Sequence, residues 1–104
     1  MTANDPTDAE IALSLQRALL GAVSARLRAV GFLRSGNEIV VTFVFDGEAS
    51  GDDVESAQIV TTEVISDFPA PELQCLEHVL RVDSPLPVPH PQLGRLVFLR
   101  KEAP

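Results

Sequence analysis

The sequence predicts an α+β fold, a two-layer sandwich in which two helices cover one face of a four-stranded sheet. Two segments carry apolar residues at helical spacing, and four have the alternation or β-branched content of strands. Their order along the chain is α-β-β-α-β-β, and two helices can cover only one face of such a sheet. The 104 residues, 45% of them apolar, are expected to form a single domain over 1–104, with disorder only in 1–6.

The first predicted helix begins at Thr7 and runs to about Val23. Residues 7–10 (TDAE) have the sequence of a capping box, in which the threonine and glutamate side chains each accept a hydrogen bond from a backbone amide. Apolar residues then recur at helical spacing: Ile11, Leu15, Ala18, Leu19 and Ala22. These residues form one stripe that should face the core.

A hairpin of two strands is predicted next. In the first strand Leu27, Ala29, Gly31 and Leu33 alternate with Arg26, Arg28, Phe32 and Arg34. Residues 35–37 (SGN) tolerate the positive φ of a turn, and 39–45 are rich in β-branched and aromatic residues. One face of this second strand is wholly apolar and should point into the core: Ile39, Val41, Phe43 and Phe45.

The second predicted helix lies between an acidic turn and two prolines. Residues 46–51 (DGEASG) have turn composition, and Asp52 and Asp53 follow where a helix cap and the positive end of the helix dipole favour negative charge. Apolar residues at 57, 60, 64 and 68 form an inner stripe, and Pro69 and Pro71 stop the helix. The β-branched run 59–62 also suits a strand, but the cap and the stripe favour a helix.

Two further strands are predicted near the C-terminus. Residues 72–83 alternate well enough for a third strand, and 93–101 are short, apolar and basic-ended like a fourth. Four prolines at alternate positions between 85 and 91 separate them. Proline cannot take part in a paired ladder, so this link is predicted to be a stiff, polyproline-like arc rather than a tight turn.

The sheet face away from the helices is predicted to need a partner. Side chains alternate between the two faces of a strand, so the residues between the inward-facing ones should point there: Glu38, Val40, Thr42 and Val44. Their neighbours should come from Leu76, His78, Leu80, Val97 and Leu99. This mixture is more apolar than is usual for a surface in contact with solvent. Either a homodimer or a heterocomplex would bury it, and the sequence leaves the choice open. A homodimer would use Val40, Val44, Leu80, Val97 and Leu99.

Charge is distributed unevenly along the chain. Residues 35–80 hold ten carboxylates and no lysine or arginine, whereas both ends are near neutral and the whole chain carries −7. Such a field repels nucleic acid and anionic membranes and attracts basic proteins. The sequence also lacks Trp and Tyr, which supply stacking surfaces for bases. Arginines near the first hairpin and the last strand are expected to protect strand edges or to pair with the protein's own acids.

No constellation of residues predicts a metal site, a cofactor or catalysis. Residues 46–52 match the opening of a calcium loop, but the glutamate expected at the twelfth place is Ala57. Cys75 and His78 lie three apart in a predicted strand and therefore point to opposite faces, which excludes a nucleophile and base pair. Cys75 is expected to be a buried apolar residue. Phosphate-binding and nucleophile motifs are absent from the sequence, which predicts a protein that is not an enzyme.

The sequence predicts a cytoplasmic protein. A single cysteine demands no oxidising compartment, and the N-terminus lacks the pattern of a signal peptide. No apolar run approaches the ~20 residues that span a bilayer.

Four segments together resemble small acidic immunity proteins of bacterial contact-dependent and other polymorphic toxin systems. They are LRAV at 27–30, TFVFDGE at 42–48, TEVISDFP at 62–69 and LVFLRKE at 96–102, within a similarity that spans 18–102. The resemblance implies a cytoplasmic inhibitor without a cofactor, which binds a toxin domain and protects the producing cell. An acidic patch would complement a basic, often nuclease-type, toxin.

An inhibitor of this kind can imitate the negative charge of nucleic acid and so gain fast, specific association. The expected partner-binding residues are the carboxylates of the acidic turn and second helix, with one exposed apolar anchor: Asp46, Glu48, Asp52, Asp53, Glu55, Ile59, Glu63 and Asp67. For any single carboxylate, a solvated helix face is the simpler interpretation. The alternative function is a non-catalytic homodimeric module, structural or regulatory, joined through the open sheet face.

Overall fold

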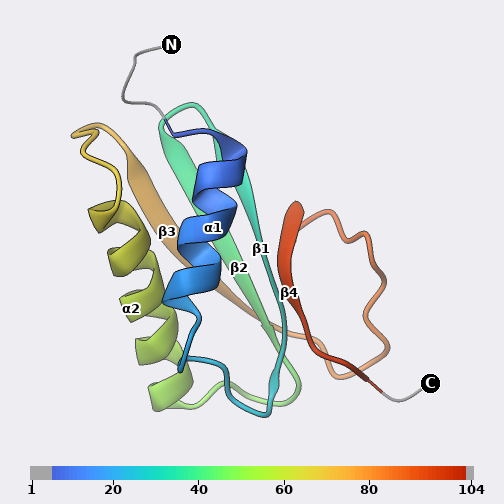
Figure 1. The fold of residues 1–104 in the computed structure, drawn as a ribbon. Helices are drawn as coiled ribbons and strands as arrows, with labels where there is room; N and C mark the ends of the chain where they lie inside the picture. Colours follow the sequence, from blue (N-terminus) through green and yellow to red (C-terminus); the bar gives the residue numbers. More distant parts are fainter. Residues whose placement is uncertain (1–5, 103–104) are drawn as a thin grey trace.

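The computed structural model of the protein describes residues 6–102. Within them lie two helices and four strands in the predicted order, which confirms the α+β fold (Figure 1). The elements are α1 (Asp8–Ala18), β1 (Leu27–Ser35), β2 (Glu38–Phe45), α2 (Gly51–Ser66), β3 (Gln74–Arg81) and β4 (Arg95–Leu99). Of the residues expected to be disordered, 1–5 lie outside the described range, and Pro6 is buried with its carbonyl accepting a hydrogen bond from Arg34.

The sheet is mixed, with the strand order β3-β2-β1-β4. β1 pairs antiparallel with β2, which confirms the predicted hairpin, and also pairs antiparallel with β4. β3 runs parallel to β2, because α2 carries the chain back across the sheet between them. Both helices lie on the same face of the sheet (Figure 1). Consequently α1 and α2 form one layer and present their outer sides to solvent.

Both helices begin with a capping box. Thr7 and Glu10 form the predicted one at α1. At α2 the N-cap is Ser50 and the reciprocal carboxylate belongs to Asp53, so the cap lies two residues before the predicted Asp52-Asp53 pair. α1 ends at Ala18, earlier than predicted, because the chain turns at Gly21, whose φ of 81° a helix cannot contain.

The core between the sheet and the helices uses the predicted faces. The four apolar residues of β2 that were expected to point inward are all buried there: Ile39, Val41, Phe43 and Phe45. Ile11 and Leu15 of α1 and Val60 and Val64 of α2 pack against them. The β-branched run 59–62 therefore lies in a helix, because tertiary burial of its inner side outweighs its strand propensity.

A bulge in β1 changes the predicted alternation of this strand. Leu27 pairs with Phe45 and Ala29 with the adjacent Val44, so Arg28 is the extra residue. Leu27 consequently lies on the helix side of the sheet, whereas Ala29 lies on the opposite side. The prediction that both share one face is wrong, because the extra residue of a bulge interrupts the alternation of side chains between the two faces.

The proline-rich link, residues 82–94, covers the part of the sheet face away from the helices that lies around Ala29 and Val44. It runs from the end of β3 to the start of β4, at the two edges of the sheet (Figure 1). Leu86 and Leu93 of the link pack with Ala29 and Val44 in a second small core, where Val44 has no exposed surface. The expectation that this face lies open is therefore wrong around Val44.

The predicted dimer residues are separated by this arrangement. Val44 is covered, Leu80 packs against the second core, and Val97 occupies a bulge in β4 and packs toward the helices instead. Val40 and Leu99 remain on the open face. Val40 lies in register between Leu33 and Leu76, which are 47% and 46% exposed, so one apolar row across three strands stays accessible.

The link approaches the sheet most closely at Gly31. A Cβ atom built there would lie 2.0 Å from the carbonyl oxygen of Leu93 and 3.0 Å from that of Arg95. Only glycine permits backbone to pack on backbone at this distance. Gly31 is thus the residue that allows the link to close over the sheet.

We expect Gly31→Ala to lower the free energy of unfolding by about 1–3 kcal/mol or more, because the added methyl group overpacks the contact with Leu93. Urea unfolding followed by far-UV circular dichroism measures this. Gly51→Ala is the matched control, since a Cβ there meets nothing within 4 Å. Equal effects of the two substitutions would contradict the assignment of Gly31 as the contact point.

Candidate partner-binding surface

The predicted partner-binding residues include an exposed stripe along α2. Asp52, Glu55, Ile59 and Glu63 recur three or four residues apart, so their side chains share one face of the helix. All four are exposed, and Ile59 exposes 50% of its surface. We call these four residues the α2 stripe. The structure therefore brings together half of the predicted set on the outer side of the helical layer.

Asp53, by contrast, has a role inside the protein. It is buried, and its Oδ2 accepts hydrogen bonds from the Ser50 amide at 2.9 Å and from Arg26 Nη2 at 2.7 Å. The hydrogen bond from the Ser50 amide is the main cause that lowers the pKa of Asp53, and the Arg26 charge lowers it further. Arg26 Nη1 also donates to the Glu48 carbonyl at 2.8 Å. Asp53 thus anchors the start of α2 to the acidic turn.

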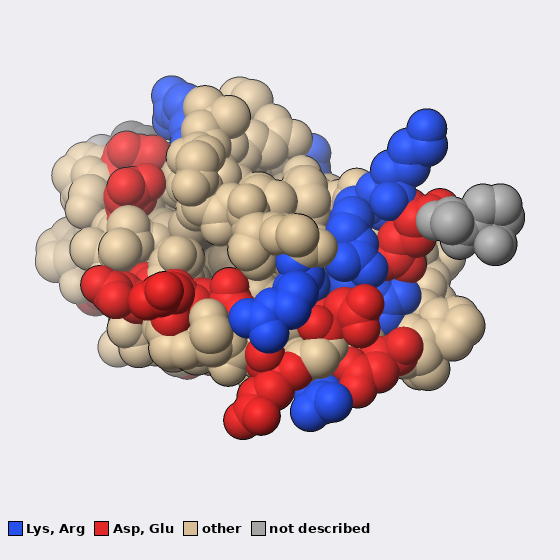
Figure 2. All heavy atoms as spheres, turned by 90° about the horizontal axis from the view of Figure 1, so that it is seen from below, with Lys and Arg blue, Asp and Glu red and all other residues tan. Residues whose placement is uncertain are grey.

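The acidic turn lies at an end of the molecule where arginine and carboxylate side chains lie next to one another. Asp46 lies 3.6 Å from Arg100, and Asp83 accepts hydrogen bonds from the Gly47 amide and from Arg81. Figure 2 shows positive and negative side chains interleaved across this end. The arginines here pair with the protein's own acids, as expected. The predicted acidic field is therefore partly neutralised around Asp46.

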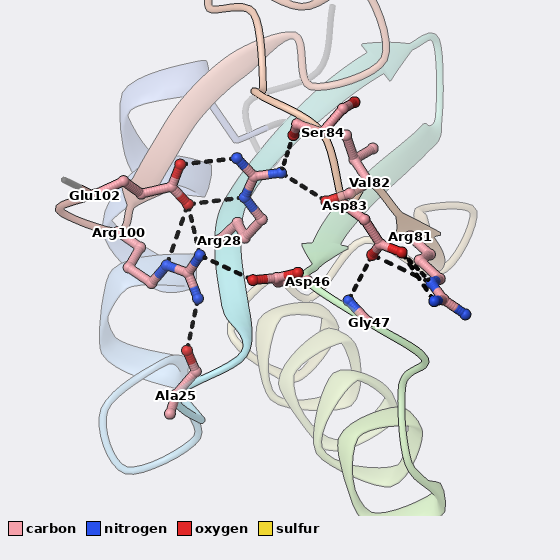
Figure 3. Close-up of polar contacts among 10 residues, drawn as sticks. All are labelled: Ala25, Arg28, Asp46, Gly47, Arg81, Val82, Asp83, Ser84, Arg100 and Glu102. Carbon is pink, nitrogen blue, oxygen red and sulfur yellow. Dashed lines mark hydrogen bonds and ion pairs between the residues drawn. The ribbon is translucent and has the colours of Figure 1, made fainter. Parts of the chain in front are cut away.

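Arg28 forms the centre of this mixed-charge end (Figure 3). Its side chain is 4% exposed, and Nε and Nη2 donate to the two carboxylate oxygens of Glu102 at 2.8 Å each. Nη1 donates to the carbonyls of Val82 and Ser84 at 2.6 Å. One guanidinium thereby joins β1, the start of the link and the C-terminal segment. The sequence offered no signal for this contact, because residues 28 and 102 are far apart in the chain.

These contacts change the acid–base properties of Glu102. Hydrogen bonds from Arg28, and then from Arg100, lower the pKa of the Glu102 carboxyl group from 4.5 to about 2. The same pairing raises the pKa of Arg28. Because the folded-state pKa of Glu102 is depressed, its stabilising effect is complete above pH 4.5 and is lost as the pH falls toward 2.

We expect the stability difference between the wild-type protein and Glu102→Gln to stay constant from neutral pH to about 4.5 and to shrink as the pH is lowered further toward 2. Protonation removes the charge that Arg28 binds, so both proteins then hold a neutral side chain at this position. Urea unfolding at a series of pH values measures the difference. Glu72→Gln, an exposed carboxylate in the loop before β3, is the control. A difference that does not vary with pH would refute the role of the ionised Glu102.

The C-terminal end of α2 carries the wrong charge for a helix end. A helix C-terminus is partially negative and favours cations, yet the last turn of α2 has no basic residue. Glu63 lies near this end, and Asp67 is the C-cap residue. Asp67 is partly compensated from α1, by Ser14 Oγ at 2.6 Å and Arg17 Nη2 at 3.4 Å. The fold thus explains Asp53 but gives no reason for Glu63.

Glu63→Lys is therefore expected to stabilise the folded protein by about 0.3–1 kcal/mol at low ionic strength, since a cation suits the C-terminal end of α2. The gain should shrink as salt is added. Chemical unfolding at two salt concentrations tests this. The control is Glu55→Lys, which places the same charge nearer the N-terminal end and should bring no gain. Destabilisation by Glu63→Lys would show that Glu63 supports the fold.

Cys75 and His78 are separated, as the spacing predicts. Cys75 packs against the helix-side core, and burial, assisted by the charge of Glu77, raises the pKa of its thiol to about 11. His78 pairs with Thr42 on the opposite side of β3 and is exposed. A thiol with this pKa stays protonated and is a poor nucleophile at neutral pH. Among residues 6–102 no three His, Cys, Asp or Glu side chains gather as metal ligands, and no helix is long and apolar enough to cross a bilayer.

Comparison with known proteins identifies the class of this chain. Residues 8–102 match the family model described as MafI2 immunity protein. The match extends from the first residue of α1 to Glu102, which pairs with Arg28. The match confirms the resemblance to immunity proteins of polymorphic toxin systems, whose role is to neutralise a toxin. The chain belongs to the MafI2 immunity protein family, and this membership implies a toxin as its partner. No curated protein matches the sequence.

Proposed function

We propose that this protein neutralises a basic, nuclease-type toxin in the cytoplasm by binding it through the α2 stripe. The observation that carries the proposal is the state of the stripe carboxylates. Asp52, Glu55 and Glu63 are exposed, and none forms an ion pair with another of the described residues. They therefore differ from Asp53 and Asp46, whose charges are engaged within the protein.

Electrostatic complementarity supports this choice of partner. A toxin that cleaves nucleic acid needs a positive surface to hold phosphates. A row of carboxylates attracts the same surface, raises the association rate and takes the place of the nucleic acid. Ile59 lies in the middle of the row, where an apolar side chain can be desolvated while charges surround it. The α2 stripe thus combines an anchor with a charged rim.

The remaining predicted residues contribute differently in this proposal. Glu48 is exposed in the turn before α2, and Asp67 is exposed at the C-cap of the helix, so each adds negative charge near one end of the stripe. Asp46 faces Arg100 and adds mainly to the long-range field. Asp53 acts indirectly, because its bonds to Ser50 and Arg26 position the first turn of α2. Inhibition requires occupancy of the toxin and no catalysis.

We expect the double substitution Asp52→Lys and Glu55→Lys to slow association with the toxin domain on the order of tenfold at low salt, because attraction becomes repulsion at the N-terminal half of the stripe. The cognate toxin domain is the ligand, and stopped-flow or surface plasmon resonance gives the rates. The wild-type association rate should fall as salt rises, and the variant should lose most of this dependence.

The matched control changes net charge equally at another place. Glu38→Lys with Glu72→Lys also reverses two exposed carboxylates, at the start of β2 and in the loop before β3. The control variant should retain most of the association rate, since it leaves the stripe intact. Equal rates for the wild-type protein and the stripe variant would sink the proposal.

A homodimer through the open sheet face is the second candidate. The observation that favours it is the accessible row of Leu33, Val40 and Leu76 on three adjacent strands. An apolar contact of this kind would respond little to salt. Sedimentation velocity at low and physiological ionic strength distinguishes such self-association from charge-steered toxin binding.

A further inference from the structure

We propose that the groove between α1 and the C-terminal end of α2 receives an arginine side chain of the toxin. The inference rests on the proposed function and deepens it, because it names the chemistry of one contact. The neighbouring α2 stripe would steer the toxin, and the groove would hold one of its basic residues.

The groove consists of two adjacent hollows. α1 and α2 run antiparallel side by side (Figure 1). A hollow of about 350 Å³ opens between them, lined mainly by Ser14, Arg17, Thr62, Glu63, Ser66 and Asp67. A second hollow of about 290 Å³ shares Arg17 and Asp67 and is otherwise lined by Glu10, Leu13 and Phe68. The Arg17–Asp67 contact therefore lies between a polar compartment and a partly apolar one.

The polar compartment offers hydrogen-bond acceptors to a ligand. The hydroxyl protons of its three alcohols are all donated within the protein: Ser14 to Asp67 Oδ2 at 2.6 Å, Thr62 to the Gln58 carbonyl at 2.8 Å, and Ser66 to the Thr62 carbonyl at 2.8 Å. Each hydroxyl oxygen is left with lone pairs only. The carboxylate of Glu63 adds two more acceptor oxygens. A ligand that fits must bring several donors.

The Asp67 carboxylate is held in place and has one oxygen atom available to accept a hydrogen bond from a ligand. Ser14, which is only 1% exposed, and Arg17 both donate to Oδ2, while Oδ1 accepts no hydrogen bond from the described residues. The buried Ser14 holds the carboxylate in one orientation, which reduces the entropy lost on binding. Arg17 is 71% exposed and 3.4 Å away, so its own ion pair is weak and easily exchanged.

The helix end independently points to a cation. Among the described residues that line the first hollow, two carboxylates and the partial negative charge of the α2 C-terminus face one guanidinium, that of Arg17. A bound cation would supply the positive charge that the last turn of α2 lacks. This requirement arises from the helix dipole and does not depend on the hydrogen-bond pattern of the groove.

Arginine suits the groove better than lysine. Its planar guanidinium carries five N–H donors in a fixed arrangement, which can meet acceptors on two helices at once. The methylene groups of arginine can pack on the apolar compartment, whose wall includes Leu13, 59% exposed, and Phe68. An ammonium group would use fewer of these contacts.

The test uses N-acetyl-arginine amide as the probe and ¹H–¹⁵N NMR titration of the full chain as the measurement. Saturable shifts are expected for the amides of Ser14, Thr62, Ser66 and Asp67. N-acetyl-citrulline amide, which is neutral, should leave them unchanged, and N-acetyl-lysine amide should bind more weakly. Glu63→Gln should weaken arginine binding about tenfold, as loss of one charged contact implies. Arg17→Ala should strengthen it.

Matched variants separate this inference from the proposed function. Asp52→Asn with Glu55→Gln removes charge from the other end of α2 and should leave arginine binding unchanged. Shifts confined to that end, or equal shifts with citrulline, would overturn the groove even where the stripe variant slows toxin association. With the toxin domain itself, Glu63→Gln should raise the dissociation rate. An unchanged rate would overturn the groove as a toxin contact, while the stripe would still be judged by its own association rates.

Discussion

A single buried guanidinium, that of Arg28, holds together three parts of this chain that are distant in sequence. A buried charge is unfavourable unless its donors are satisfied and its charge is paired. Both oxygens of Glu102 and the carbonyls of Val82 and Ser84 meet this requirement. The bulge in β1 makes the arrangement possible, because it inserts Arg28 as an extra residue between Leu27 and Ala29, which are both buried, on opposite sides of the sheet.

Because the link covers part of one sheet face, it determines which surfaces remain accessible to a partner. With Arg28 fixing the start of the link and Gly31 admitting its backbone, Leu86 and Leu93 cover Val44. Leu33, Val40 and Leu76 remain as an accessible apolar row on the sheet, while the helical layer on the other face stays uncovered (Figure 1). The charged residues of the helical layer are thus exposed because the rest of the molecule closes on itself.

Sequence spacing predicted the helices and strands, but it did not predict contacts between residues that are far apart in the chain. The capping box at Thr7 and the apolar face of β2 could be read from the sequence, since spacing alone determines them. The bulge at Arg28, its bonds to Glu102 and the cover over Val44 could not, because each depends on residues brought close only by the fold. For the site, the sequence identified the acidic residues of α2 but could not separate Asp53, which Arg26 binds, from the free carboxylates.

The position of charges along α2 bears on what the helix is for. Asp52 and Asp53 lie at the end where negative charge stabilises a helix, so the fold alone accounts for them. Glu63 and Asp67 lie at the opposite end, where negative charge is unfavourable, and within residues 6–102 the cation that lines the groove with them is the exposed Arg17. A residue that opposes local stability is explained most directly by an interaction outside the chain. In the binding mode proposed above, the partly compensated C-terminal end of α2 is where a positive charge from the toxin would do most to complete the structure.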